Sequence, residues 1–301
     1  MNHFAHPQTT TPPAIVTWSR KATLAAYFAD YGARQVWTPQ SARAVDLAAR
    51  TFPYADMPMR DLRRAHIETW IRTMHDAELA PATIRTRVAN IRAILYGAMR
   101  DGIITDNPAA GVRLPRAIGR STTMTLPTEH QVTELIAAAE DPYNLLFALA
   151  AYAGLRLGEA RALTWADVDL NARVLRVRHQ LQQLPGGGWS RTPPKYGSYR
   201  SVPIADQLVP LLLDAEREEG RFVIEGVGGG PVHPGSVQRR WAEGCEQVGL
   251  GSRLHVHDLR HLYASTLLAD GNNVLTVQKR LGHARASTTL DVYAHAMGNS
   301  I

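Results

Sequence analysis

Cysteine is almost absent from this 301-residue sequence, and so are the long apolar runs of membrane proteins. Cys245 is the single cysteine, which excludes an intramolecular disulfide framework and a zinc ribbon, since a ribbon needs several thiolates. No apolar run approaches the ~20 residues that a helix needs to cross a bilayer. Met1–Pro7 also lacks the basic and apolar segments of a secretory signal, so we expect a cytoplasmic protein without a membrane partner.

The excess of basic residues is small, but it is confined to one part of the chain. The formal net charge is +6 at pH 7. Residues 1–118 carry 15 Lys and Arg against 9 Asp and Glu, whereas residues 119–301 carry 18 of each. Because such asymmetry is typical of proteins that bind a polyanion, we expect the N-terminal part to meet one.

Length and composition predict a globular protein of two domains. Hydrophobic residues make up 45% of the chain and charged residues 20%, which excludes wholesale disorder. A length of 301 residues exceeds the size of one typical domain. Composition predicts a flexible arm over residues 1–18, a helical domain over 19–107, a linker over 108–127 and a second domain over 128–301.

The first domain has a helical pattern throughout. Apolar periodicity predicts helices over about 21–31, 39–51, 59–76 and 81–100. In the last of these, an apolar stripe recurs every three or four residues, at Ile84, Val88, Ile91, Leu95 and Met99. Several arginines fall off this stripe, namely Arg85, Arg87, Arg92 and Arg100. Their side of the helix is either an ordinary solvated face or a face that contacts phosphates.

The second domain is predicted to combine helices with a small sheet. Helices are expected over residues 129–139 and 144–153. Residues 173–181 alternate in polarity and predict one half-buried strand, and residues 200–204 predict another. Most of the remaining sequence is helical in pattern. The expected fold class is therefore mainly α with a small β-sheet, in which a helical domain precedes a mixed α+β domain.

Four short segments of the second domain concentrate arginine, histidine, lysine and tyrosine. They are Gly154–Glu159, Pro194–Arg200, His257–His261 and Leu281–His283, the last followed ten residues later by Tyr293. Each segment has an ordinary explanation by itself. An arginine and a glutamate three residues apart on a helix can form a simple ion pair, and a lysine on a hairpin tip is usually solvated. The combination of all four segments is what indicates a functional site.

Together, these side chains suit the transfer of a phosphoryl group. Several fixed cations in one pocket favour a concentrated anion, and a phosphodiester fits. The sequence has no cluster of Asp and Glu that would hold Mg²⁺, which argues against a metal-dependent nuclease. Arginines can neutralise the charge on non-bridging oxygens, a tyrosine can attack phosphorus, and a lysine can protonate the leaving alkoxide. These residue types therefore describe phosphoryl transfer to tyrosine without metal or ATP.

These segments resemble the tyrosine recombinase (phage integrase) family. The resemblance spans about residues 20–295 and is strongest over His257–His261, Leu281–His283 and Ser287–Tyr293. All six catalytic positions hold the expected residue types in the expected order. The resemblance implies a site-specific DNA recombinase or integrase that cleaves and rejoins strands through a 3′-phosphotyrosine intermediate.

The resemblance assigns the chemical steps to Tyr293, His257 and Lys195. Tyr293 would attack the scissile phosphate and release a 5′-hydroxyl. His257 would shuttle the tyrosine proton, and Lys195, on a hairpin tip, would protonate the leaving 5′-oxygen. Because rejoining conserves the phosphodiester bond, the family's reaction implies no cofactor and no metal.

Binding of the phosphate is assigned to a second group of residues by the same resemblance. Arg156 and Arg260 would clamp the phosphate, and His283 would donate a hydrogen bond to it. Glu159 would orient the arginine and histidine side chains without reacting itself.

The first domain resembles the core-binding domain of the same family. With the catalytic domain it would form a clamp around duplex DNA, and Arg85, Arg87 and Arg92 are the residues that we expect to face it. The resemblance implies a homotetramer on two synapsed core sites, and it allows accessory DNA-bending proteins. About 20 residues precede this domain, which we expect to leave no room for a separate arm-site domain. Eight residues follow Tyr293, fewer than in the tails that family members extend into a neighbouring subunit.

Several other interpretations stay open at this point. A relaxing topoisomerase of related mechanism would act as a monomer without synapsis, and a non-catalytic DNA-binding protein would lack the tyrosine or an arginine. A metal-dependent hydrolase would be inhibited by chelators. A zinc site could use His257, His261 and His283, but Arg260 beside the metal is electrostatically unfavourable, and Asp258 stands where a zincin has Glu.

Overall fold

The structure, a computed structural model, describes residues 17–115 and 126–283, apart from residues 20, 185, 186, 216, 217, 219, 252 and 253. The chain divides into two compact units, Met1–Gly119 and Arg120–Ile301. Tyr293, almost all of the predicted N-terminal arm and half of the predicted linker lie outside the described residues.

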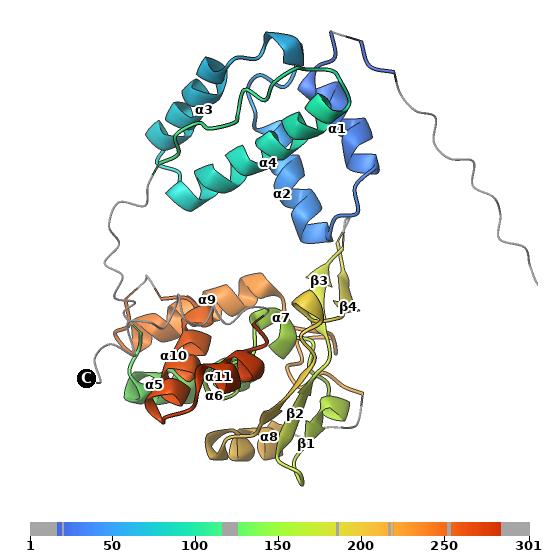
Figure 1. The fold of residues 1–301 in the computed structure, drawn as a ribbon. Coiled ribbons are helices and arrows are strands. Elements are labelled where there is room, and N and C mark those ends of the chain that lie inside the picture. The colour runs from blue at the N-terminus through green and yellow to red at the C-terminus, as the bar shows by residue number, and fades with distance from the viewer. Residues whose placement is uncertain are drawn as a thin grey trace, which may run out of the picture. The chain divides into compact units, whose positions relative to one another are not determined.

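Four helices form the first unit, coloured blue to green in Figure 1. Their N-termini follow from local sequence: Thr38 caps a helix whose first residue is proline, and Thr23 accepts a hydrogen bond from the backbone of Ala26. The helices are α1 (Leu24–Ala33), α2 (Pro39–Arg50), α3 (Arg64–Asp76) and α4 (Pro81–Arg100).

The apolar stripe predicted for the last helix of this unit is confirmed. Four of its five members are fully buried in α4, and Met99 is half-buried against the same core. The single helix predicted over 59–76 is wrong, because the chain forms a 3₁₀ turn at Met59–Asp61 and begins α3 only at Arg64. Leu62 has an extended backbone and a buried side chain, which interrupts the helical path.

The segment after α4 packs against the first unit before the chain leaves it. Arg92 donates from Nε to the carbonyl oxygen of Ala109 at 2.9 Å, and the Asn107 side-chain amide donates to the carbonyl oxygen of Arg92 at 3.0 Å. Ala109 and Val112 are buried in the core of this unit. The part of the predicted linker that is described therefore starts with packed residues.

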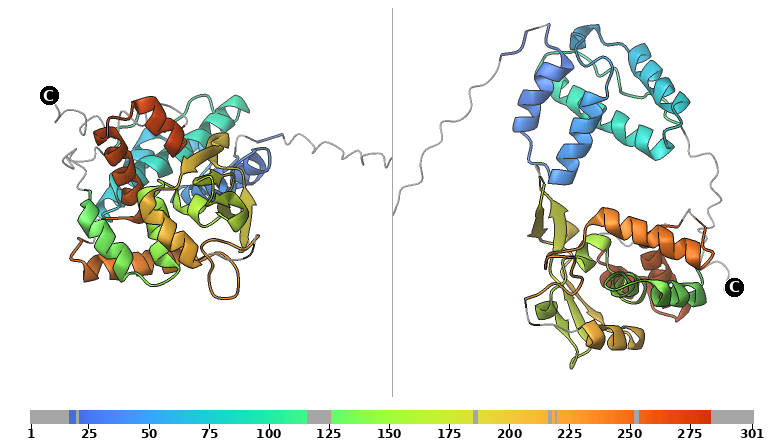
Figure 2. Two further views of the ribbon diagram at one scale, coloured as in Figure 1. Left: turned by 90° about the horizontal axis from the view of Figure 1, so that it is seen from below. Right: turned by 180° about the vertical axis from the view of Figure 1, so that it is seen from behind.

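The second unit gathers most of its helices on one side and its strands on the other, as the views in Figures 1 and 2 agree. Its described helices are α5 (Glu129–Ala138), α6 (Tyr143–Tyr152), α7 (Leu157–Ala160), α8 (Val209–Ala215), α9 (Pro234–Gln247), α10 (Val256–Ala269) and α11 (Val274–Leu281).

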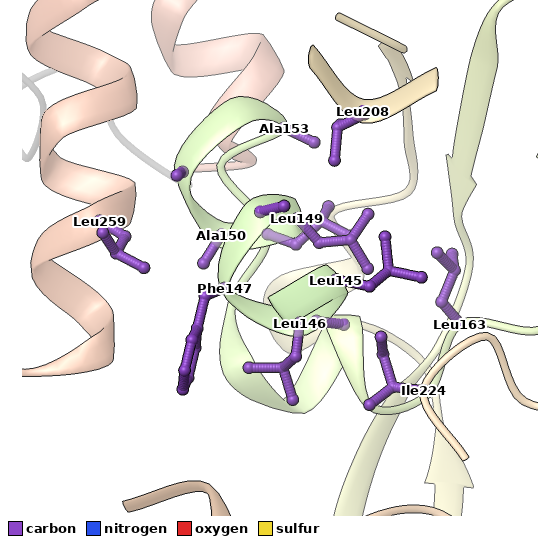
Figure 3. Close-up of a cluster of buried hydrophobic side chains, with 14 of the residues drawn as sticks. Leu145, Leu146, Phe147, Leu149, Ala150, Ala153, Leu163, Leu208, Ile224 and Leu259 are labelled. Carbon is purple, nitrogen blue, oxygen red and sulfur yellow. The ribbon is translucent and has the colours of Figure 1, made fainter. Parts of the chain in front are cut away.

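Helix α6 forms the centre of this unit, because it is apolar on every side. In Figure 3, Phe147 and Ala150 lie on the side of Leu259 of α10, whereas Leu145 lies on the side of Leu163. A helix that is hydrophobic all round is typical of a buried position. Helix α11 is packed differently, since its Val277 and Leu281 share a small separate cluster with residues of α10.

The strands form two small antiparallel sheets. One has the order β1 (Val168–Asp169), β2 (Val174–Val177), β5 (Arg200–Pro203), and the other pairs β3 (Gln180–Gln183) with β4 (Trp189–Thr192). The single strand predicted over 173–181 is therefore wrong. Alternation reports which side chains are buried, and Leu175, Val177 and Leu181 are buried, but it does not report which strands pair.

The expected fold class, mainly α with a small β-sheet, is confirmed. The first unit is helical, and the second combines helices with small antiparallel sheets. Across the described residues, no helix is both long enough and apolar enough to cross a bilayer.

A glycine between α6 and α7 gives the first testable prediction. Gly154 has a left-handed backbone with φ +62°, and a Cβ there would lie 2.4 Å from Cδ1 of Tyr263. Gly154→Ala should therefore lower the free energy of unfolding through both backbone strain and overpacking, by about 2–4 kcal/mol in total. Urea denaturation followed by circular dichroism measures the change.

Gly271→Ala is the matched control, because Gly271 also has a left-handed backbone, with φ +82°, but a Cβ there has no atom within 4 Å. It should cost ~1 kcal/mol. Equal losses in the two variants would contradict a packing role for Gly154.

Candidate active site

A buried carboxylate lies at the centre of the candidate site. The side chain of Glu159, on α7, is fully buried. Its Oε1 accepts a hydrogen bond from Nη1 of Arg156 at 2.7 Å, and its Oε2 accepts one from Nη2 of Arg200 at 2.7 Å. Nη1 of Arg260 lies 3.9 Å from Oε2. These four residues, Arg156, Glu159, Arg200 and Arg260, are called the arginine cluster below.

Local capping explains why Glu159 turns back toward Arg156. Arg156 is the N-cap residue of α7, and its backbone N–H donates to Oε2 of Glu159 at 2.9 Å. Burial alone would raise the pKa of Glu159, but the hydrogen bond and charge of Arg200 and the charge of Arg156 outweigh it and lower that pKa to about 2. The carboxylate is therefore ionised at neutral pH.

The C-terminal end of α11 is the second partner of the three arginines. Three successive backbone carbonyls there each accept a hydrogen bond from a different member of the cluster. Arg200 donates from Nε to Arg280, Arg260 donates from Nη2 to Leu281, and Arg156 donates from Nη2 to Gly282. The last carbonyls of a helix have no intrahelical partner and carry partial negative charge, which suits guanidinium groups.

The three arginines differ in how much of each side chain reaches solvent. Arg260 and Arg200 are almost completely buried, and Arg260 also donates from Nη1 to the carbonyl oxygen of Gly154. The side chain of Arg156 is 22% exposed. Arg156 is therefore the member of the cluster with the most accessible surface, whereas very little of Arg200 or Arg260 reaches solvent.

Arg200 is the residue that sequence reasoning missed. It belongs to the basic segment Pro194–Arg200, but it was expected only as the first residue of a strand. Its place on β5 opposite Val177 brings it to a carboxylate 41 residues earlier in the chain. No local sequence signal pairs Arg200 with Glu159, since the two residues are brought together only by the fold.

Histidines on α10 and after α11 lie close enough to the arginine cluster for its positive charge to affect their pKa values. The backbone of His255 is capped by Asp258, which starts α10 and places His257 and Arg260 one turn apart. His283 follows Gly282, whose left-handed backbone, with φ 65°, ends α11. The imidazoles of His257 and His261 contact each other edge-to-face, with ring centroids 4.8 Å apart.

The imidazoles of His257 and His283 are neutral at pH 7. Desolvation lowers the pKa of His283 to about 4, and the charges of Arg260 and Arg156 add to that effect. Desolvation, His261 and Arg260 likewise lower the pKa of His257 to about 4. Within the described residues, no three His, Cys, Asp or Glu side chains are grouped as a metal ion would require.

Lys195 is exposed on a 3₁₀ turn, Lys195–Gly197, that precedes β5. The turn is joined to the cluster through the residues that follow it. Ser198 and Arg200 approach Gly282 so closely that a Cβ on that glycine would lie 3.0 Å from both. Residues of this segment and of the end of α11 together line a cleft of about 540 Å³, and His283 is one of them.

The structure thus brings together Arg156, Glu159, Arg260 and His283 from distant parts of the sequence, with His257 in the same electrostatic environment. Tyr293 lies outside the described residues.

The arginines predicted to face DNA lie in the first unit. Arg85 is exposed on α4 and donates to the carbonyl oxygen of Pro115 at 3.3 Å, whereas Arg92 is bonded to Ala109. Arg87 is half-buried, and its Nε has no hydrogen-bond partner among the described residues. Their contact with DNA stays a prediction.

Glu159→Gln tests the central carboxylate. Removing its charge leaves three buried or half-buried guanidinium groups without their counter-charge, and we expect a loss of about 3 kcal/mol in the free energy of unfolding. Glu243→Gln is the matched control, because Glu243 forms exposed ion pairs with Arg239 and Arg240. That change should cost less than about 1 kcal/mol. A Glu159→Gln loss no larger than the control would refute the role of the carboxylate.

The low pKa of His283 predicts how stability depends on pH. An unfolded imidazole has its ordinary pKa of 6.5 and the folded one a pKa of about 4, so the unfolded chain binds the extra proton between these values. Stability should therefore fall as the pH drops from 6.5 to 4. Urea midpoints at pH 7.0 and 5.0 should differ less in His283→Gln than in the unchanged protein. His130→Gln, at an exposed position, should leave the difference intact, and a His283→Gln profile like the unchanged one would contradict the assignment.

Comparison with known proteins places the chain in a family. The sequence profile described as "Phage integrase family" matches residues 127–299, a range that includes Tyr293. The tyrosine recombinase XerC of Xylella fastidiosa is 30% identical over 277 residues, which cover 91% of this chain and 85% of XerC. A tyrosine recombinase of Thermosipho africanus is 28% identical over 254 residues, covering 80% of this chain and 83% of the relative.

Solved structures share the fold. The Tn1549 transposon integrase, in complex with a circular intermediate DNA, superposes with a TM-score of 0.77 at 20% identity and covers 91% of this chain and 95% of that one. A lambda integrase tetramer bound to a Holliday junction gives a TM-score of 0.69 at 19% identity, over 89% of this chain and 77% of that one. Because the family profile spans more than half of the sequence, and a recombinase aligns at 30% identity over most of it, the chain belongs to the phage integrase family and is a site-specific tyrosine recombinase.

Proposed function

We propose that this recombinase cleaves one strand of duplex DNA through Tyr293 and rejoins it to another strand without a metal ion. The observation that supports this most strongly is the arginine cluster. Three guanidinium groups are held by one carboxylate and by three successive carbonyls of α11, directly before His283. Such a preorganised set of donors suits the charge that develops on a phosphodiester during transfer.

The chemical step exchanges one phosphate ester for another. The Tyr293 oxygen attacks the scissile phosphorus, and the bond from phosphorus to the 5′-oxygen breaks as the tyrosine ester forms. The phenolic proton goes to His257, and the 5′-oxygen takes a proton from the ammonium of Lys195. Attack by a 5′-hydroxyl of another strand reverses each transfer, so no outside energy source is consumed.

Arg156 and Arg260 bind the non-bridging oxygens in this proposal, with Arg200 adding charge beside them. Arg156 has the accessible edge, and Arg260 is held rigidly beneath the site by two backbone carbonyls. Rigidity favours catalysis, because donors that are fixed in advance need no reorganisation as the reaction proceeds. The loss of one such donor typically lowers the rate about 10²–10³-fold.

The histidines gain their function from the anion. Without one, desolvation by burial, to which the guanidinium charges add, keeps His257 and His283 neutral at pH 7, with a pKa of about 4 for each. A phosphodiester beside them adds negative charge, which raises both pKa values toward the working pH. His257 can then accept the tyrosine proton, and His283 can donate a hydrogen bond to the phosphate.

The assembly that we propose is a homotetramer on two synapsed core sites in the cytoplasm. Arg85, Arg87 and Arg92 of the first unit are proposed phosphate contacts, in line with the excess of basic residues over residues 1–118. The relatives in complex with DNA and with a Holliday junction support this assembly by their likeness in fold. Accessory DNA-bending proteins are compatible with it.

Tyr293→Phe tests the nucleophile. Phenylalanine retains the ring and lacks the attacking oxygen, so the variant should bind its DNA site with unchanged affinity and form no covalent adduct. Nicked suicide substrates trap the adduct, which a denaturing gel detects. An adduct formed by the Phe variant would show that another residue attacks.

Lys195→Ala tests the general acid. A thiolate leaves without protonation, so a substrate whose bridging 5′-oxygen is replaced by sulfur should restore much of the lost cleavage rate. Rates on the two substrates in single-turnover reactions provide the measurement. If Lys195→Ala slows cleavage of the oxygen and the sulfur substrate equally, Lys195 is not the general acid.

A further inference from the structure

The residue after Lys195 has an unusual backbone conformation. Tyr196 lies in the left-handed region, with φ 61° and ψ 23°, and Gly197 beside it has φ 62°. Residues other than Gly, Asn and Asp rarely adopt this conformation, because their Cβ approaches the following carbonyl. A tyrosine is thus an unfavourable choice for this position of the turn, and a backbone outlier of this kind is a reason to look for a function.

Burial does not compensate for this strain. Tyr196 is 73% exposed, so its ring gains little from packing. In the described part of the chain, the one cation or ring that contacts it is the ammonium of Lys195, which lies 5.1 Å from the ring centroid. Lys195 itself forms no ion pair with any described carboxylate. The ring and the ammonium are therefore each other's main partner.

The turn that carries both side chains is anchored at its two ends. Pro194 before it is buried, and its carbonyl oxygen accepts a hydrogen bond from the N–H of Gly197 at 2.9 Å. After it, Ser198 lies against Gly282, and Arg200 is bonded to Glu159. The backbone of Lys195 is thus fixed relative to the arginine cluster, and what is left to control is the flexible four-carbon side chain.

We propose that Tyr196 is a positioning residue, whose ring holds the Lys195 ammonium where it can protonate the leaving 5′-oxygen. This inference rests on the proposed function, in which Lys195 is the general acid. In this left-handed conformation the ring contacts the ammonium of the preceding residue, which gives a reason for the strain to be retained. Asparagine would relieve the strain at this position, but it would leave the ammonium without its partner.

A stacking contact between Tyr196 and a DNA base is the competing explanation for an exposed ring. The geometry favours the positioning role, because the ring already contacts the ammonium. The two roles differ in one measurable way. A positioning residue acts only through the acid, so its loss should matter only when the leaving group needs a proton.

Tyr196→Asn, assayed on oxygen and on bridging 5′-sulfur substrates, separates the two roles. Single-turnover cleavage of the oxygen substrate should slow about 5-fold, the factor expected for one exposed cation–π contact. Tyr196→Asn should cleave the sulfur substrate at the same rate as the unchanged protein does. Tyr196→Phe retains the ring and should match the unchanged protein on both substrates. Tyr199→Asn, at another exposed tyrosine three residues further, is the control for loss of an aromatic side chain and should show no difference between substrates.

Three outcomes would overturn the proposal. Equal slowing of Tyr196→Asn on both substrates would assign the ring to DNA binding, and no slowing on oxygen would show that the ammonium needs no partner. A Tyr196→Phe variant as slow as Tyr196→Asn would assign the effect to the hydroxyl. Because asparagine suits the left-handed backbone, the urea midpoint of Tyr196→Asn should not fall, which excludes unfolding as the cause of a slower rate.

Lys195→Ala, measured beside these variants, separates this inference from the function on which it rests. If Lys195→Ala is rescued by sulfur and Tyr196→Asn is not, the positioning role alone is wrong. If Lys195→Ala shows no rescue, Lys195 is not the acid, and both assignments are wrong.

Discussion

The candidate active site depends on one buried negative charge. Glu159 is surrounded by three guanidinium groups, two of them inaccessible to solvent, and it is the only carboxylate that the described residues bring into contact with them. A buried arginine is costly unless it is paired and hydrogen-bonded. One carboxylate shared among three cations leaves a net positive charge, so the cluster is held together and still attracts an anion.

Several helices and strands position the three arginines around the Glu159 carboxylate. The N-cap of α7, strand β5 and helix α10 each supply one arginine, and the C-terminal end of α11 with its cap supplies a run of carbonyl oxygens as acceptors. Close approach requires two glycines in left-handed conformations, Gly154 against Tyr263 and Gly282 against Ser198. The apolar core around α6 fixes the elements from which these side chains extend.

Features that depend on neighbours in sequence could be predicted, and features that depend on strand pairing could not. The stripe on α4 and the one-turn spacing of His257 and Arg260 follow from helical periodicity, and both are present in the structure. Arg200 could not be assigned, since its partner is 41 residues away and the register of β2 with β5 brings the two together. The strand predicted over 173–181 failed for the same reason, because polarity alternates without a break across two separate sheets.

Helix α11 is short, eight residues, and its apolar contacts belong to a small cluster shared with α10 and apart from the main core. The guanidinium groups that donate hydrogen bonds to its final carbonyls therefore contribute much of the stability of this helix. If the proposed phosphate site uses these guanidinium groups, its occupancy and the order of this helix are thermodynamically linked, because linkage is reciprocal. Amide hydrogen exchange in α11 would then report whether the proposed site is occupied.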